Sequence, residues 1–72
     1  MSHLSSRSVA RRIDAELKRQ ERTRSWLARQ LGVNAMWVSR RLSGTQRLKI
    51  DEVADISATL AVPPKVLLDR DP

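Results

Sequence analysis

Apolar residues recur at helical spacing through the first third of the chain. Val9, Ile13 and Leu17 repeat every four residues, and charged or polar residues fill most of the positions between them. This spacing places the three side chains on one face of a helix. The helix is expected over residues 6–21, because it follows a cluster of serines that favours a helix start.

Two shorter helices joined by a tight turn are predicted next. Thr23 is a good N-cap for a helix over residues 24–31, and Gly32 can take the positive φ that ends it. Asn34 follows almost at once and can cap a third helix over residues 35–43.

The last third of the chain predicts two more helices. Val53, Ile56 and Leu60 form one apolar stripe of a helix over residues 50–60, with acidic residues in its positively polarised first turn. The lysine before this helix is a poor N-cap. A short helix over residues 64–69 opens on a proline, which suits the first helical position.

These patterns predict an all-α fold of five short helices. There is no strand-like alternation, no internal repeat and no linker-like segment, so residues 1–72 are expected to form a single domain. A chain of 72 residues buries a modest fraction of its surface, which requires a small and economical core.

The composition argues against an enzyme. The chain has no cysteine, its one histidine is His3 near the N-terminus, and two glycines cannot make a phosphate-binding loop. Three acidic residues, Asp51, Glu52 and Asp55, are expected to interact favourably with the dipole of their helix and to keep its surface soluble. We therefore expect no catalytic residue, no metal site and no cofactor.

Targeting signals are also missing from the sequence. No apolar run approaches the roughly 20 residues that span a membrane, and the N-terminus lacks the apolar segment of a signal peptide. A cytoplasmic protein that associates with the nucleoid of a bacterial host cell is the expectation.

Charge is distributed unevenly along the chain. The net charge is +6, with +9 in residues 1–49 and −3 in residues 50–72, and eleven of the fourteen basic residues are arginine. A basic body suggests a surface that meets a polyanion, and arginine suits phosphate and guanine recognition. Ordinary solvated helix faces, and a GC-rich source for the arginines, are the alternative explanations.

The most informative segment is the helical pair of residues 24–43. Ala28 is small where two helices must approach, Gly32 supplies the turn, and Val38 continues the apolar seam. These residues stand at positions five, nine and fifteen of a twenty-residue window, an arrangement that resembles the helix-turn-helix signature.

The resemblance extends over residues 9–68, which are similar to the lambda repressor/Cro-like (XRE-type) family of helix-turn-helix DNA-binding domains. It implies that the third helix enters the major groove of double-stranded DNA. The chain departs from the family pattern on that helix, where Met36, Trp37 and Arg41 replace the usual smaller, polar or aliphatic residues. Arg24 stands where the family usually has a glutamine.

Helical geometry and the resemblance together indicate which residues would touch DNA. At 100° per residue, Ala35 shares a side of the third helix with the core residues, whereas Met36 and Arg40 lie opposite. Arg40 can bond guanine O6 and N7 together, and apolar side chains can pack on thymine methyl groups. The predicted base contacts are Ala35, Met36, Ser39 and Arg40.

The predicted phosphate contacts lie at the ends of the two helices: Arg24, Ser25, Asn34, Trp37, Arg41, Ser43, Thr45 and Arg47. Two alternatives stay open here. Asn34 could serve only as a cap, and Trp37 could stack with the guanidinium of Arg41 instead of touching DNA. Trp26 is expected to pack against the first helix.

A sequence-specific transcription regulator, of the phage repressor or Cro type, is the function expected from these features. The alternative is a protein-interaction module or antitoxin-type domain of the same fold. Its support is the apolar run Val66, Leu67 and Leu68, which cannot all be buried in so small a core and could contact a second copy of the chain or a further domain.

Overall fold

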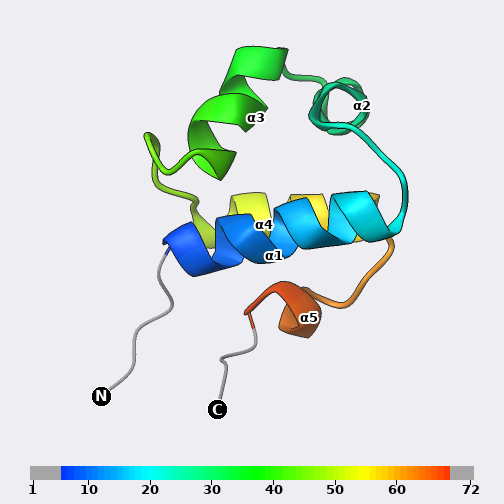
Figure 1. Cartoon of the computed structure of the whole chain (residues 1–72). Coiled ribbons are helices and arrows are strands. Elements are labelled where there is room, and N and C mark those ends of the chain that lie inside the picture. The colour runs from blue at the N-terminus through cyan, green and yellow to red at the C-terminus, as the bar shows by residue number, and fades with distance from the viewer. Residues whose placement is uncertain (1–5, 69–72) are drawn as a thin grey trace.

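The computed structural model describes residues 6–68 and confirms the all-α prediction (Figure 1). The histidine discussed above and the predicted end of the fifth helix at residue 69 lie outside the described residues. The five helices are α1 (Ser6–Arg19), α2 (Arg24–Leu31), α3 (Ala35–Leu42), α4 (Ile50–Thr59) and α5 (Pro64–Leu68).

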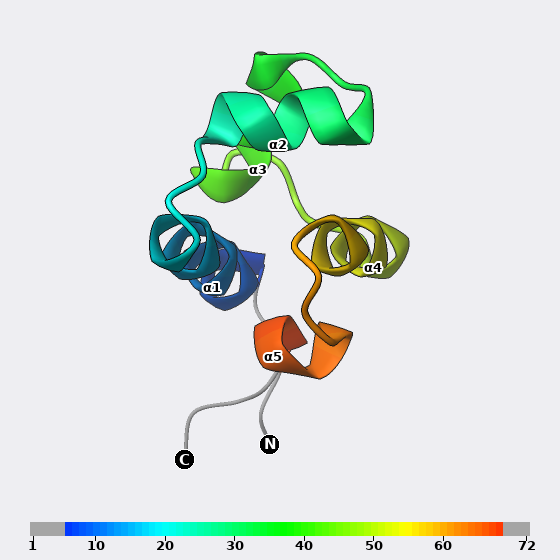
Figure 2. The same ribbon diagram turned by 90° about the vertical axis from the view of Figure 1, so that its right-hand side faces the viewer.

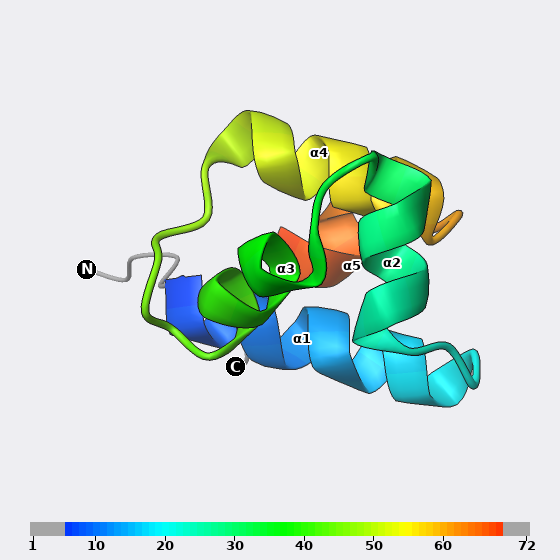
Figure 3. The ribbon, with the colours of Figure 1, turned by 90° about the horizontal axis from the view of Figure 1, so that it is seen from above.

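The helices surround one core. α1 and α4 form its two sides, α5 lies beneath them, and α2 and α3 lie above (Figure 2). α3 packs on both α1 and α2, α2 also packs on α4, and α5 closes the opposite side against α1 and α4. Seen from above, α3 lies over the space between α1 and α4, and α2 crosses from one to the other at one end (Figure 3).

The predicted apolar stripes point into this core. Val9, Ile13 and Leu17 of α1 are buried, and so are the three apolar residues of the α4 stripe. The buried hydrophobic residues are Val9, Ala10, Ile13, Leu17, Leu27, Ala28, Val38, Leu42, Leu48, Val53, Ile56, Leu60 and Leu67. Both tryptophans are partly buried against this core.

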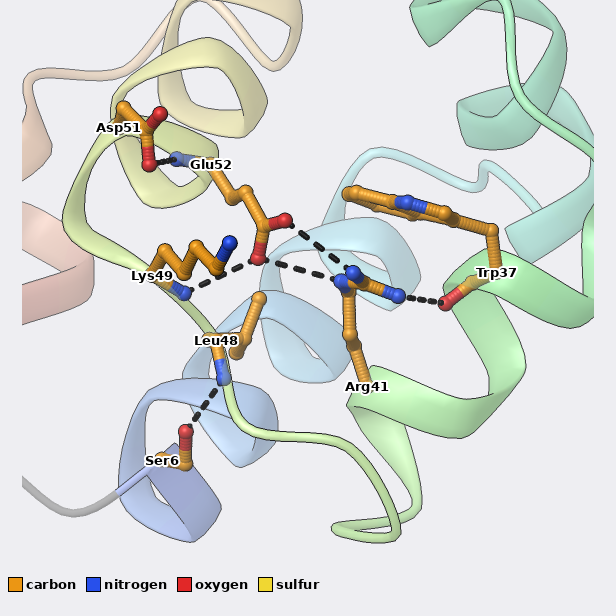
Figure 4. A network of polar contacts seen from close by, with 7 residues as sticks. All are labelled: Ser6, Trp37, Arg41, Leu48, Lys49, Asp51 and Glu52. Atoms are coloured by element: carbon orange, nitrogen blue, oxygen red, sulfur yellow. Dashed lines mark hydrogen bonds and ion pairs between the residues drawn. The ribbon is translucent and has the colours of Figure 1, made fainter.

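Leu48 is a core residue that the sequence analysis missed, because it lies between helices and belongs to no stripe. Its side chain is buried, and its backbone N–H donates to the Ser6 hydroxyl at 2.7 Å (Figure 4). This bond ties the segment before α4 to the first residue of α1, which places the start of α4 relative to the rest of the domain.

Helices α1, α2 and α4 all end in the same way. In each, the chain turns through one residue of positive φ, which is Glu21 (57°), Gly32 (73°) and Ala61 (58°) respectively. The next N–H bonds back to a carbonyl five residues earlier, as in Arg22 to Leu17. The prediction that α1 reaches residue 21 was therefore wrong, because Glu21 has left the helical conformation.

A polar clasp joins the C-terminal ends of α1 and α4. The buried carboxylate of Glu16 accepts hydrogen bonds from Arg19 and Gln20, and the Gln20 amide also donates to the Leu60 carbonyl at 2.8 Å. The bond from Arg19, and less strongly the bond from Gln20, lower the pKa of Glu16 below its ordinary value. This clasp stabilises the charged form of a carboxylate that burial alone would disfavour.

The C-terminal apolar run is divided between core and surface. Leu67 is fully buried, Leu68 is partly buried, and Val66 is 44% exposed. The prediction that these three residues could not all be buried is confirmed, but Leu67 is unavailable for contact with another molecule.

Replacing Ala61 by glycine should stabilise the domain. The left-handed conformation costs an ordinary residue about 1–2 kcal/mol, and glycine avoids this cost at an entropic loss of about 0.5–1 kcal/mol. We expect Ala61→Gly to raise the free energy of unfolding by about 0.5–1 kcal/mol, measured by denaturant unfolding followed by circular dichroism. The matched control is Ala15→Gly in the exposed middle of α1, which should lower stability by about 1 kcal/mol. Equal destabilisation by both substitutions would contradict the assignment.

Candidate nucleic-acid interface

The N-terminal ends of α2 and α3 are capped by the residues that the sequence indicated. The Thr23 hydroxyl accepts a hydrogen bond from the Trp26 N–H at 2.9 Å, and the Asn34 side chain accepts one from the Trp37 N–H at 2.8 Å. Gly32 makes the turn between them, and a Cβ added there would meet nothing within 4 Å. Close packing therefore does not demand a glycine at this turn, but its backbone conformation favours one.

The exposed surface of α3 carries the four predicted base contacts. Ala35, Met36, Ser39 and Arg40 are all exposed, whereas Val38 and Leu42 are buried. Ala35 shares a side of the helix with Val38 and Leu42, as expected, but it is exposed rather than buried. Ala35 is the first residue of α3, at the end of the helix farthest from α1, where the core no longer reaches (Figure 1).

Met36 is unusual because its large apolar side chain is 57% exposed. It borders a shallow hollow of about 330 Å³ on the outer side of α3, together with Asn34, Trp37, Arg40, Arg41 and Gln46. The hollow combines an apolar wall with guanidinium and amide donors, which are the groups that read base edges in the major groove.

Gln46 is a candidate contact that the sequence analysis missed. The loop after α3 folds back on its own helix, because the N–H groups of Thr45 and Gln46 both donate to the Arg40 carbonyl, at 3.0 and 3.1 Å. This brings the Gln46 side chain to the edge of the hollow. A glutamine amide can form hydrogen bonds with adenine at N6 and N7, so the residue type at position 46 could have indicated a base contact.

The predicted phosphate contacts after α3 lie on an exposed turn. Ser43, Thr45 and Arg47 are all exposed, and Gly44 turns the chain with a φ of +88°. The hydroxyls of Ser43 and Thr45 lie 3.0 Å apart and form a hydrogen bond. Both remain accessible at the C-terminal end of α3, and their contact with phosphate stays a prediction.

At the start of α2, Ser25 is exposed and Arg24 is partly engaged. The Arg24 guanidinium makes two hydrogen bonds to Asp14 of α1, at 3.2 and 2.6 Å. About two-fifths of the Arg24 side chain is exposed, so the pair is partly open to solvent. A phosphate at this end of α2 would therefore compete with Asp14 for the same arginine.

Arg41 is the predicted phosphate contact whose surroundings differ most from the expectation. Its guanidinium turns toward α4 and donates from Nε and Nη2 to the two carboxylate oxygens of Glu52, both at 3.1 Å (Figure 4). A third bond runs from Nη1 to the Trp37 carbonyl at 3.3 Å. The Arg41 side chain is only 12% exposed, because it fills the junction between α3 and α4.

One of the two arrangements considered for Trp37 is present in the structure, and its contact with phosphate stays a prediction. The guanidinium carbon of Arg41 lies over the Trp37 ring, 3.7 Å from its centroid, and the ring is partly buried. The structure thus shows the stacked arrangement. Arg22 lies over the ring of Trp26 in a similar way, at 4.5 Å. Such contacts between cations and aromatic faces are favourable by about 0.5–2 kcal/mol.

Glu52 also caps α4, which explains how a lysine can precede this helix. One Glu52 oxygen accepts the Lys49 N–H at 3.0 Å, which is one half of a capping box (Figure 4). The N–H of Glu52, which a cap side chain would accept, donates instead to the Asp51 carboxylate at 3.0 Å. Burial by itself would raise the pKa of Glu52. The hydrogen bonds from Arg41 and Lys49 outweigh it, and with the charges of both residues they leave the pKa below its ordinary value.

Within residues 6–68, no group of three or more histidine, cysteine or acidic side chains is placed to hold a metal ion. No helix in that range is both long enough and apolar enough to span a membrane.

The fold and this surface define a small all-helical domain in which two capped helices meet at a three-residue turn. The BetR domain family model matches residues 2–71, nearly the entire chain, and the chain belongs to this family. No curated protein and no solved structure matches the chain.

The two lowered carboxylate pKa values predict a loss of stability in acid. A carboxyl whose pKa is lower in the folded than in the unfolded state stabilises the fold above its unfolded pKa, near 4.5, and this contribution is lost as the pH falls through the folded value. We expect Glu52→Gln to lower stability by about 1 kcal/mol at neutral pH. The variant should also lose less stability than the original protein on acidification, in denaturant unfolding at a series of pH values. Parallel pH profiles for the two proteins would show that the Glu52 charge is not stabilised by the fold.

Proposed function

We propose that this domain binds double-stranded DNA sequence-specifically and regulates transcription, with α3 in the major groove. The observation that carries the proposal is the outer face of α3, where Met36 and Arg40 are exposed one helical turn apart beside a hollow. An exposed methionine beside an arginine has little structural purpose, whereas thymine methyl groups and guanine edges offer partners for both.

Charge supports the same proposal. The first 49 residues carry a net charge of +9, and the exposed residues Arg40, Arg47 and Lys49 all lie on α3 or on the segment that follows it. Long-range attraction to phosphates would bring the domain to DNA, and contacts from helix ends would fix its register.

A finer assignment rests on the resemblance of residues 9–68 to the lambda repressor/Cro-like family. On this basis we propose a repressor or Cro-type regulator, as found in phages. Two capped helices joined at Gly32, with small Ala28 buried beneath, are what such a domain requires.

A protein-interaction role is the second candidate. Val66 of α5 and Ile50 of α4 are large apolar residues with exposed fractions of 44% and 69%. The sequence analysis did not identify Ile50 as an exposed apolar residue. A second copy of the chain or a further domain could cover Val66. Binding through α5 would leave α3 available for DNA, because the two helices lie on opposite sides of the domain (Figure 1).

The direct test is selection from a random duplex library, followed by affinity measurements on the enriched and scrambled sequences at two salt concentrations. A shared motif bound about 10³-fold more tightly than scrambled DNA is the expected result. Weak, steeply salt-dependent binding without any motif would contradict sequence-specific recognition and favour the interaction role.

Arg40→Ala should separate base reading from general attraction. Loss of a bidentate guanine contact costs about 1–3 kcal/mol, so affinity for the enriched motif should fall about 5- to 150-fold. The preference for one base should also weaken at a single position of the motif. Arg47→Ala should weaken motif and scrambled DNA about equally. The control is Lys65→Ala on α5, which removes one positive charge from the far side and should change little. Equal losses on both DNAs for Arg40→Ala would exclude Arg40 as a reader of bases.

A further inference from the structure

Arg41 has an unusual position for a residue so close to the proposed reading face. It follows Arg40 directly and borders the same hollow, yet all three nitrogens of its guanidinium donate hydrogen bonds within the domain. Two edges bond Glu52 and the Trp37 carbonyl, and one face lies against the Trp37 ring (Figure 4).

An arginine released at this place would be free to contact a DNA phosphate, the role that the sequence predicts for Arg41. Phosphate contacts raise the affinity for every DNA sequence equally, so they strengthen binding to scrambled DNA as much as binding to the correct site. Specificity depends on the ratio of the two affinities. An additional non-specific contact increases binding to the many competing sites and so hinders the search for the correct one.

Glu52 is well placed to prevent this. Its carboxylate is held by the Lys49 N–H at the start of α4, only 16% of its side chain is exposed, and it meets Arg41 with both oxygens. A carboxylate fixed in this way competes with phosphate for the same guanidinium without paying the entropy of ordering a mobile side chain.

We propose that Glu52 is a positioning residue for DNA recognition, which holds Arg41 away from phosphate and against Trp37 so that binding depends on Arg40. The inference rests on the proposed function. It assigns Glu52, which lies on α4 outside the reading helix, a role in specificity as well as in capping its own helix.

The test compares salt dependence on random-sequence duplex DNA. Each phosphate contact adds about 0.9 to the slope of log affinity against log salt. Glu52→Ala should therefore steepen the slope by about 0.9 and lower the ratio of affinities for the enriched motif and random DNA. The double variant Glu52→Ala/Arg41→Ala should return the slope to its original value, because the released arginine is gone.

The control is Asp55→Ala, which removes the same charge from an exposed position of α4 and should leave the slope unchanged. A Glu52→Ala variant that folds but keeps the original slope overturns the inference. So does a double variant as steep as Glu52→Ala, since the effect would then come from lost negative charge alone.

A second variant covers the case in which Glu52→Ala does not fold. Glu52→Gln keeps an oxygen for the Lys49 N–H while losing the charge that holds Arg41, and it should steepen the slope in the same way. An unchanged slope in folded Glu52→Gln overturns the inference. Failure of the original protein to bind any duplex would overturn the proposed function itself, and this inference with it.

Discussion

The carboxylate of Glu52 forms hydrogen bonds with groups from two helices at once. It caps α4 through the Lys49 N–H and receives the guanidinium of Arg41 from α3. Few apolar residues tie these elements together, since the segment between them is polar up to Leu48. The stacking of Arg41 on Trp37 and the place of both residues beside the hollow depend on this ionic junction (Figure 4), whereas α3 itself is held by its packing on α1 and α2.

Such a junction matters because the helices are too short to be stable alone. Isolated helices below about 12–15 residues are marginal in water, and four of the five here have ten residues or fewer. All of them depend on the shared core; α2 and α3 are also stabilised by the side-chain caps Thr23 and Asn34, and α1, α2 and α4 end in left-handed turns. The exposed face of α3 can carry residues chosen for contact with another molecule, because its opposite face supplies the packing.

The sequence predicted the features that depend on local spacing. The stripes of α1 and α4 and the caps of α2 and α3 were found because period and residue type determine them. It did not predict the pairing of Arg41 with Glu52, the burial of Leu48 or the place of Gln46 beside the hollow. These depend on how the loop after α3 folds back in space, and eleven residues separate the two charged partners.

The central claim is that the outer face of α3 is the surface that meets DNA. It is tested most directly by following backbone amide resonances by NMR while the selected duplex is titrated into the labelled domain. The account predicts the largest shifts from Met36 to Arg40 and at the start of α2, with little change at Leu67 in α5 on the far side. Shifts concentrated on α5, with α3 unaffected, would contradict it.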